Sequence, residues 1–336
     1  MFQLSDLARR IIVAPMAGGA STPELVAAAS AAGGMGFLAA GYKDVVTVED
    51  QVKAVRALDH GPFGVNLFVP DAEPADLEAA RRYRDQLAPL AERYGIELPE
   101  PRQDDDGWSQ KVEALLDLEV PAVSFTFGCP DADVVRRFRD RGIQTIATVT
   151  SADEAVRTQA SGVGCLALQG PDAGGHRATF DASAHPGTEH LEEVVMQVRR
   201  VSSLPLVVAG GITARASVQH WLGQADAVQL GTAFLDAAEA GTQPAYRQAL
   251  QDPRYTETAL TRAFSGRWAR GLCNDFIDRY SALAPAAYPA VNQLTGALRG
   301  AAGRAGDPQN LSLWAGTGWR DMPSGSTTDI MAGLAS

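Results

Sequence analysis

Short apolar runs recur along the first two thirds of the chain, and each is followed by a turn and an amphipathic stretch. The runs are rich in β-branched residues, which favour strands, whereas the stretches between them repeat apolar positions with the spacing of a helix. The pattern therefore predicts a series of strands that alternate with helices. The predicted strands cover residues 11–15, 35–40, 63–69, 122–128, 143–149, 165–170, 204–211 and 226–232.

The segments between these runs begin with residues that favour the start of a helix. Thr22-Pro23-Glu24 combines a capping hydroxyl, a proline at the first helical position and an acid in the first turn, and Ser151 with Glu154 forms a capping-box pattern. Strands that alternate with helices form a parallel sheet, and eight of them close into a (β/α)8 TIM barrel. A doubly wound open sheet is the alternative.

Two regions of the chain exceed what a simple barrel repeat needs. Residues 70–120 contain charge clusters and a long helical pattern, which is too much for one crossover. Residues 235–290 have a helical pattern and end in a segment rich in Pro and Ala. We therefore predict a barrel over residues 1–234 with a helical insertion at 70–120. A small helical second domain at 235–290 and a C-terminal tail at 291–336 that returns to the barrel complete the prediction.

Composition and charge narrow the class of protein. Hydrophobic residues make up 46% of the 336 residues and charged residues 21%, as in soluble globular proteins. The net charge of −11 offers no basic surface to a nucleic acid, so we expect no such partner. The uncharged run at 25–42 is mostly Ala and Gly and is broken by glycines, so we expect no membrane association.

Cysteine usage and the first residues of the chain favour a reducing compartment. Cys129, Cys165 and Cys273 are odd in number, lie far apart and lack the spacing of metal ligands, so we expect no metal site. The first segment has no long apolar stretch of the kind found in secretory signals. We therefore expect a cytoplasmic protein. The sequence leaves the oligomeric state open, with a homodimer as one alternative.

A histidine stands in the loop that follows the sixth predicted strand. In a TIM barrel, chemistry belongs to the loops after the carboxyl ends of the strands, and His176 lies in such a loop, GPDAGGHR (170–177). A lone loop histidine is commonly a solvated residue. Here, however, Gly174 and Gly175 precede it and allow the backbone to approach a ligand closely. We predict that His176 is the catalytic residue.

Glycine-rich segments follow the seventh and eighth predicted strands, in AGGIT (209–213) and QLGTAF (229–234). Loops at these two positions of a barrel commonly bind a phosphate through backbone N–H groups. Glycines that merely end strands are the alternative, and finding them at both positions favours a ligand site. The predicted phosphate-binding residues are Gly210, Gly211, Gly231 and Thr232.

Two amide side chains stand near strand ends, although Asn in particular is depleted in strands. Asn66 lies near the end of the third predicted strand, and Gln169 lies near the end of the sixth. Each amide either hydrogen-bonds a ligand ring or holds the loop that begins there. The residues alone leave both alternatives open.

Taken together, these motifs resemble those of the class I nitronate monooxygenases, a family formerly called 2-nitropropane dioxygenases. The similar segments cover most of the chain outside residues 70–120, namely 14–42, 65–68, 124–128, 169–177, 205–235 and 261–274. The resemblance implies a (β/α)8 barrel with a small substrate domain and FMN as the cofactor. It also implies oxidation of alkyl nitronates by O2 to a carbonyl compound and nitrite, with propionate 3-nitronate as one candidate substrate.

The resemblance assigns roles to individual residues. His176 matches the catalytic histidine of the family, Asn66 and Gln169 would hold the flavin ring, and the two glycine loops would hold the ribityl phosphate. The complete set of expected cofactor-binding residues is Ala14, Pro15, Met16, Asn66, Gln169, Gly174, Gly175, Gly210, Gly211, Gln229, Leu230, Gly231 and Thr232.

The chain departs from the family pattern in the substrate pocket. Thr126 stands where the family often has a second histidine, which removes an imidazole that would line the active site. Asp172 replaces a more usual glutamate, and Thr317 replaces a common glutamine. Thr126 and Lys43 are the expected substrate-pocket residues, and a solvated surface lysine is the alternative for position 43.

The residues leave the role of His176 and the reaction itself open. A neutral imidazole would act as a base on a nitroalkane, and the rate would rise with pH. A protonated imidazole would attract the nitronate oxygens, and nitronate binding would weaken as the imidazole loses its proton. One alternative activity is an NADH-dependent FMN reductase of quinones or enoyl thioesters. Another is a flavin-free barrel that binds a phosphorylated metabolite.

Overall fold

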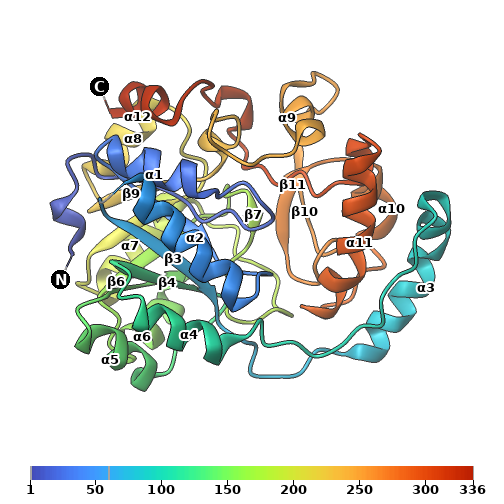
Figure 1. Ribbon diagram of the computed structural model, residues 1–336, viewed down its shortest axis with the longest axis horizontal. Helices are drawn as coiled ribbons and strands as arrows, with labels where there is room; N and C mark the ends of the chain where they lie inside the picture. The colour runs from blue at the N-terminus through green and yellow to red at the C-terminus, as the bar shows by residue number, and fades with distance from the viewer. Residues whose placement is uncertain (1, 60, 336) are drawn as a thin grey trace.

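The computed structural model describes residues 2–59 and 61–335, and a closed barrel of parallel strands forms its centre (Figure 1). The strand order around the barrel is β1-β2-β3-β4-β5-β6-β8-β9, and β9 pairs with β1. These strands are β1 (Ile11–Val13), β2 (Met35–Ala39), β3 (Phe63–Phe68), β4 (Ala122–Thr126), β5 (Gln144–Val149), β6 (Cys165–Gln169), β8 (Leu206–Ala209) and β9 (Ala227–Leu230). Each predicted strand is present, and closure of the barrel rules out the open sheet.

Alternate side chains of each strand point to opposite sides of the barrel wall. In β6, Leu166 and Leu168 pack outward in the core shared with the helices, whereas Cys165 and Ala167 pack inside the barrel. The same alternation turns the next residue, Gln169, inward at the carboxyl end of the strand. A polar side chain at this position therefore faces the mouth of the barrel.

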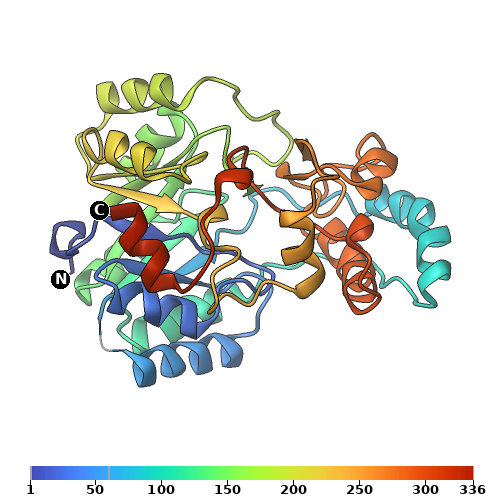
Figure 2. The ribbon, with the colours of Figure 1, turned by 90° about the horizontal axis from the view of Figure 1, so that it is seen from above.

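Helices surround the barrel and cover the outer face of its strands (Figures 1 and 2). They are α1 (Pro23–Ala31), α2 (Val45–Leu58), α4 (Trp108–Asp117), α5 (Ala132–Asp140), α6 (Ala152–Ala160), α7 (Leu191–Val201), α8 (Arg215–Leu222) and α12 (Thr327–Ala335). The short turn η1 (Leu4–Asp6) covers the amino end of the interior. The C-terminal helix α12 packs against α1 and α8, so both ends of the chain lie on the barrel side of the molecule.

A second group of elements lies beside the barrel, toward the right of Figure 1. It consists of α3 (Leu77–Tyr94), α9 (Pro244–Gln251), β10 (Thr258–Thr261), β11 (Ala269–Leu272), α10 (Asp275–Tyr280) and α11 (Ala290–Arg304). Helices α3 and α11 pack against each other around buried residues that include Tyr83, Leu87 and Leu294. The hairpin of β10 and β11 pairs with β7 (Gly175–His176), which ties the loop after β6 to this group. Two short turns complete it, η3 (Pro308–Asn310) and η4 (Trp319–Asp321). The turn η2 (Thr232–Phe234) follows β9 and buries Ala233 and Phe234 in the barrel core.

The packing of these elements differs from the boundaries expected from the sequence. Segment 235–290 is not wholly helical, because β10 and β11 lie within it. Within 70–120, α3 extends away from the barrel, whereas α4 packs against α2 and α5 in the ring of barrel helices. Helix α11 occupies the start of the expected tail, yet it packs with α3. Helical periodicity gives the type of an element and not its packing partner, so the division into separate domains stays a prediction.

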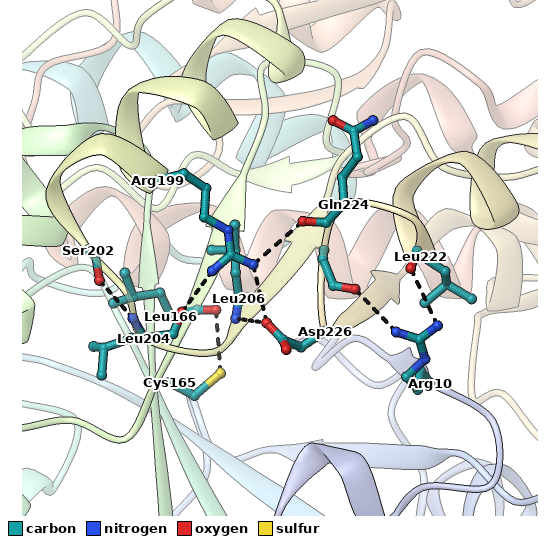
Figure 3. Close-up of polar contacts among 11 residues, drawn as sticks. Arg10, Cys165, Leu166, Arg199, Ser202, Leu204, Leu206, Leu222, Gln224 and Asp226 are labelled. Carbon is teal, nitrogen blue, oxygen red and sulfur yellow. Dashed lines mark hydrogen bonds and ion pairs between the residues drawn. The ribbon is translucent and has the colours of Figure 1, made fainter.

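Paired polar groups hold the amino end of the barrel (Figure 3). Asp226, directly before β9, accepts a hydrogen bond from the backbone N–H of Leu206 at 2.7 Å and pairs with the guanidinium of Arg199 at 3.2 Å. Arg199 also donates to the carbonyl of Leu204 at 3.0 Å. These contacts join the starts of β8 and β9 to helix α7.

Nothing in the described chain resembles a membrane span. No helix among residues 2–59 and 61–335 combines the length and the apolar character that crossing a bilayer requires. The run at 25–42, which is long enough to span a bilayer if it were helical throughout, instead divides into helix α1, a turn and strand β2. The three cysteines are free.

Candidate active site

A cavity of about 600 Å³ opens at the carboxyl ends of the barrel strands. Its wall combines strand ends and loops of the barrel with residues of α11 and of segment 311–318. Every cofactor-binding residue expected from the sequence lines this cavity, together with His176 and Thr126. The fold therefore brings positions from 14 to 232 to one site, where barrels of this type place their ligands.

Of the two expected substrate-pocket residues, the structure brings only Thr126 to the cavity. Its Oγ1 accepts a hydrogen bond from Nδ2 of Asn66 at 2.9 Å. Lys43 is not among the lining residues. Its ammonium group instead donates to Oε1 of Gln51, on α2, at 2.7 Å, and burial lowers its pKa. Lys43 therefore supplies no charge to the cavity wall.

Backbone N–H groups without partners gather where β8 and β9 end. Gly210 and Gly211 have φ angles of +114° and +69°, which only glycine adopts readily. Within the described residues, no acceptor bonds the N–H groups of Gly210, Gly211, Gly231 or Thr232. A Cβ at Gly210 would come within 3.2 Å of the backbone of Gly170. Free donors beside a compact backbone turn are suited to an anion such as phosphate.

The imidazole of His176 is held by Ser265, which lies between β10 and β11. Nε2 of His176 is 2.8 Å from Oγ of Ser265. That hydroxyl accepts from the backbone N–H of Arg267 at 3.2 Å and lies 3.1 Å from the carbonyl of the same residue. All three contacts are satisfied when the hydroxyl donates to the carbonyl and Nε2 carries the ring proton, which leaves Nδ1 as the acceptor. Three aromatic rings enclose the imidazole: Phe127, Tyr288 and Trp314.

Burial and neighbouring cations keep His176 uncharged. Burial is the main cause, followed by the guanidinium groups of Arg267 and Arg299, and together they lower the pKa of His176 to about 3. The imidazole is therefore neutral at neutral pH. This favours the neutral role weighed from the sequence over the protonated one, and a base with so low a pKa accepts protons weakly.

The amide of Gln169 holds the loop on which His176 lies. Its Nε2 donates to the carbonyl of His176 at 2.9 Å, and its Oε1 accepts from the N–H of Ala178 at 2.9 Å. Asn66 donates through Nδ2 to Oγ of Ser124 at 2.9 Å. The loop-holding alternative therefore holds for Gln169, and one N–H of its amide is left for a ligand.

Arg299, which no sequence motif indicated, is the one cavity-lining residue with a permanent charge in the part of the chain that the structure describes. Its guanidinium donates to Oδ1 of Asn292 at 2.7 Å and to the carbonyl of Thr295 at 3.3 Å. Among the described residues, no carboxylate lies within 4 Å of it. An arginine in a helical pattern resembles a solvated side chain, and only the placement of α11 over the barrel mouth brings it into the cavity.

Two further cavity-lining residues were missed because their backbone conformation gives no sequence signal. Tyr42 and Phe127 have φ angles of +68° and +77°, which are rare outside glycine. The N–H of Tyr42 donates to Oδ1 of Asp106 at 2.9 Å, and the ring of Phe127 packs 4.3 Å from the guanidinium carbon of Arg267. Such strained residues are typical of ligand sites.

Comparison with known sequences agrees with this geometry. The family model described as nitronate monooxygenase matches residues 3–335. A probable nitronate monooxygenase of Staphylococcus saprophyticus is 36% identical over 313 residues, which cover 91% of this chain and 88% of the relative. A protein of the same description from Staphylococcus aureus (strain MRSA252) is 33% identical over 99% of this chain and 95% of its own length.

Solved structures give the same result for the fold. A structure described as nitroalkane oxidase from Streptomyces ansochromogenes has a TM-score of 0.96 and 43% identity, and the match covers 99% of this chain and 96% of the other. The structure of FabK from Thermotoga maritima has a TM-score of 0.74 and 22% identity over 98% of this chain and 93% of the other. The second likeness shows the fold alone.

Proposed function

This chain belongs to the nitronate monooxygenase family, and from that premise we propose that it oxidises alkyl nitronates to a carbonyl compound and nitrite, with FMN and O2. The observation that carries the proposal is the cavity at the barrel mouth. It brings unpartnered backbone N–H groups and His176 to one site. The similar structure described as nitroalkane oxidase supports the oxidation of a nitro compound at this site.

The cavity wall fits FMN. The N–H groups of Gly210, Gly211, Gly231 and Thr232 would hold its phosphate, in a turn where a Cβ at Gly210 would fill the available space. The buried hydroxyl of Thr242 also lines the cavity and has no hydrogen-bond partner in the described part of the chain, so it is free to bind a ligand oxygen. When bound, FMN supplies the electron transfer from the nitronate to O2.

The protein side chains position the substrate and exclude water. Phe127, Tyr288 and Trp314 enclose one side of the site, and Ser265 fixes the ring of His176 with Nδ1 as the acceptor. The low pKa of His176 makes it a weak base toward the α-proton of a neutral nitroalkane. We therefore expect nitronates to react faster than their parent nitroalkanes.

Oxygen consumption tests the proposal. The purified holoenzyme is mixed with ethyl nitronate, propionate 3-nitronate or nitroethane, and O2 uptake and nitrite release are followed together. The expected result is O2 uptake with nitrite release on both nitronates and a slower reaction with nitroethane. Absence of O2 uptake on every nitronate, with FMN bound, would contradict the proposed function.

Two controls separate the alternative activities. Anaerobic mixing with NADH bleaches the flavin of a quinone or enoyl thioester reductase and leaves the flavin of a monooxygenase of this type oxidised. A protein that is colourless and takes up no FMN on incubation would instead indicate a barrel for a phosphorylated metabolite. We expect a yellow protein that NADH does not bleach.

A further inference from the structure

Within the described residues, the cavity wall contains one fixed positive charge and no acidic side chain. Arg299 is that charge, and a guanidinium stays protonated over the whole working range of pH. The other arginine near His176, Arg267, pairs with the carboxylate of Asp71. Arg299 has only neutral oxygen partners. A half-buried cation without a counter-ion is costly until an anion reaches it.

Helix α11 leaves open space around this cation. Positions three, four and eight residues apart share a helix face, and the face toward the cavity presents Asn292, Gly296, Arg299 and Gly300. A Cβ at Gly296 would meet no heavy atom nearer than Nη2 of Arg299, at 3.9 Å. Nη1 of Arg299 has no hydrogen-bond partner in the described part of the chain. The guanidinium of Arg299 therefore has both an unused N–H donor and open space beside it for a ligand.

Arg299 also lies close to the proposed reaction centre. Its charge contributes to the low pKa of His176, and the phenol of Tyr42 opposes the effect of burial on the pKa of Arg299 itself. His176 and Tyr42 both line the cavity. The positive charge of Arg299 thus acts on the part of the cavity that His176 and Tyr42 line.

We propose that Arg299 binds the nitronate oxygens of the substrate and makes the site select the anion over the neutral nitroalkane. This inference rests on the proposed function and deepens it. A planar guanidinium matches two oxygens of one planar group with parallel hydrogen bonds. Neutral His176 then contacts the substrate without supplying charge, and the selectivity for nitronates resides in α11.

Variants of Arg299 test the assignment in the FMN-loaded enzyme. Replacing it by glutamine is expected to raise the KM for ethyl nitronate about 10- to 100-fold, the loss typical of a hydrogen bond to a charged group, with little change in kcat. The KM for neutral nitroethane should change less than about threefold, because the nitroalkane carries no charge. Arg299→Lys should recover part of the loss, since it keeps the charge without the planar pair of donors.

Arg304 provides a matched control. It lies in the last turn of α11, is exposed and does not line the cavity. Arg304→Gln should leave both KM values and the flavin content unchanged. If Arg299→Gln instead releases FMN and leaves the preference for nitronate over nitroethane intact, the guanidinium serves the phosphate and the proposal is wrong.

Binding of inorganic nitrate separates this inference from the proposed function. Nitrate is a planar oxyanion that needs no turnover, and calorimetry on the purified protein measures its affinity. Arg299→Gln should weaken nitrate binding about tenfold or more, whether or not nitronates are oxidised. Equal affinity in wild type and variant would overturn the assignment. If the enzyme consumes no O2 with nitronates but Arg299→Gln still weakens nitrate binding, only the proposed function is overturned.

The pH dependence distinguishes Arg299 from His176 as the anion-binding group. The charged and titratable groups near the imidazole are Arg267, Arg299 and the phenol of Tyr288, whose pKa burial raises well above its usual value. Tyr42 faces Arg299. Because the guanidinium stays charged, the KM for ethyl nitronate should be constant between about pH 6 and pH 9. A KM that rises through the ordinary titration range of histidine, and that loses this rise in His176→Asn, would assign the role to His176 instead.

Discussion

The two ends of the barrel differ in whether their polar groups have partners within the protein. At the amino end, Asp226 pairs with Arg199 and accepts the backbone N–H of Leu206, so charges and donors satisfy one another (Figure 3). At the carboxyl end, Arg299 has no carboxylate and the N–H of Gly210 has no acceptor among the described residues. The first arrangement stabilises the fold, whereas the second leaves binding capacity unused until a ligand arrives.

Two residues of the cavity wall hold an unfavourable backbone conformation. Tyr42 and Phe127, the two non-glycine residues of the cavity wall with positive φ, lie at the carboxyl end. Each such conformation costs of order 1–3 kcal/mol and persists only where the surrounding packing enforces it. Packing at the amino end is apolar, with η1 covering the interior, and the one non-glycine residue of positive φ in the turn before β4 is Glu119, at +47°. Stability and ligand binding are therefore separated along the barrel axis.

The largest expected effect comes from adding one carbon at the carboxyl end. Gly210→Ala places a Cβ within 3.2 Å of the backbone of Gly170 at a φ of +114°, so we expect loss of FMN from the purified protein. Flavin absorbance per protein measures it. Gly142→Ala is the matched control, because Gly142 also has a positive φ, +74°, yet no heavy atom within 4 Å of the added carbon. Full FMN retention in Gly210→Ala would contradict the phosphate assignment.

A smaller effect should appear at the amino end, and in stability alone. Asp226→Ala leaves the N–H of Leu206 without its acceptor, which should lower the free energy of unfolding by about 1–3 kcal/mol. KM and kcat should not change. Urea unfolding measures the difference, with Asp133→Ala as control, since the pair of Asp133 with Arg136 is exposed.

The carboxyl end should respond in the opposite sense to loss of a charge. Arg299→Gln removes a cation that has no counter-ion, so its free energy of unfolding should equal or exceed that of the wild type. A loss of stability in Arg299→Gln as large as that in Asp226→Ala would break the contrast between the two ends.

The smallest expected effect is that kcat/KM does not change with pH in the range where a histidine ordinarily titrates. The lowered pKa of His176, about 3, keeps the imidazole neutral from about pH 5 to pH 8, so kcat/KM for a nitronate should show no histidine titration there. Stability should behave differently. The unfolded chain binds a proton at His176 below about pH 6.5, so the free energy of unfolding falls as pH drops, and His176→Asn should reduce that slope. If kcat/KM instead changes with pH around 6.5, and His176→Asn removes that change, the conclusion that the imidazole is neutral is wrong.

Much of the site was predictable because it follows from local patterns. The apolar runs gave the strands, and the glycines after the seventh and eighth runs marked the free N–H groups of Gly210 and Gly231. The alternation of side chains along a strand also carries information about orientation. Because side chains alternate with period two, the outward packing of Leu166 and Leu168 already turns Gln169 toward the barrel mouth.

The rest of the site depends on contacts between distant parts of the chain. Ser265 reaches His176 across 89 positions, and its hydroxyl gave no signal in the sequence. For Lys43 the sequence position was misleading. It follows a strand end, as pocket residues do, but its ammonium group bonds to Gln51 and not to the cavity. The helical patterns at 70–120 and 235–290 were visible, but the pairing of α3 with α11 was not.

The sequence by itself determined which strands form, that they alternate with helices, and which loops supply His176 and the glycine N–H groups. These features depend on neighbours a few residues apart, whose spacing the chain fixes directly. Only the tertiary structure decided that Arg299 faces the cavity without a counter-ion and that His176 is neutral. Charge and burial depend on which distant groups pack together, and folding alone brings α11 over the mouth of the barrel.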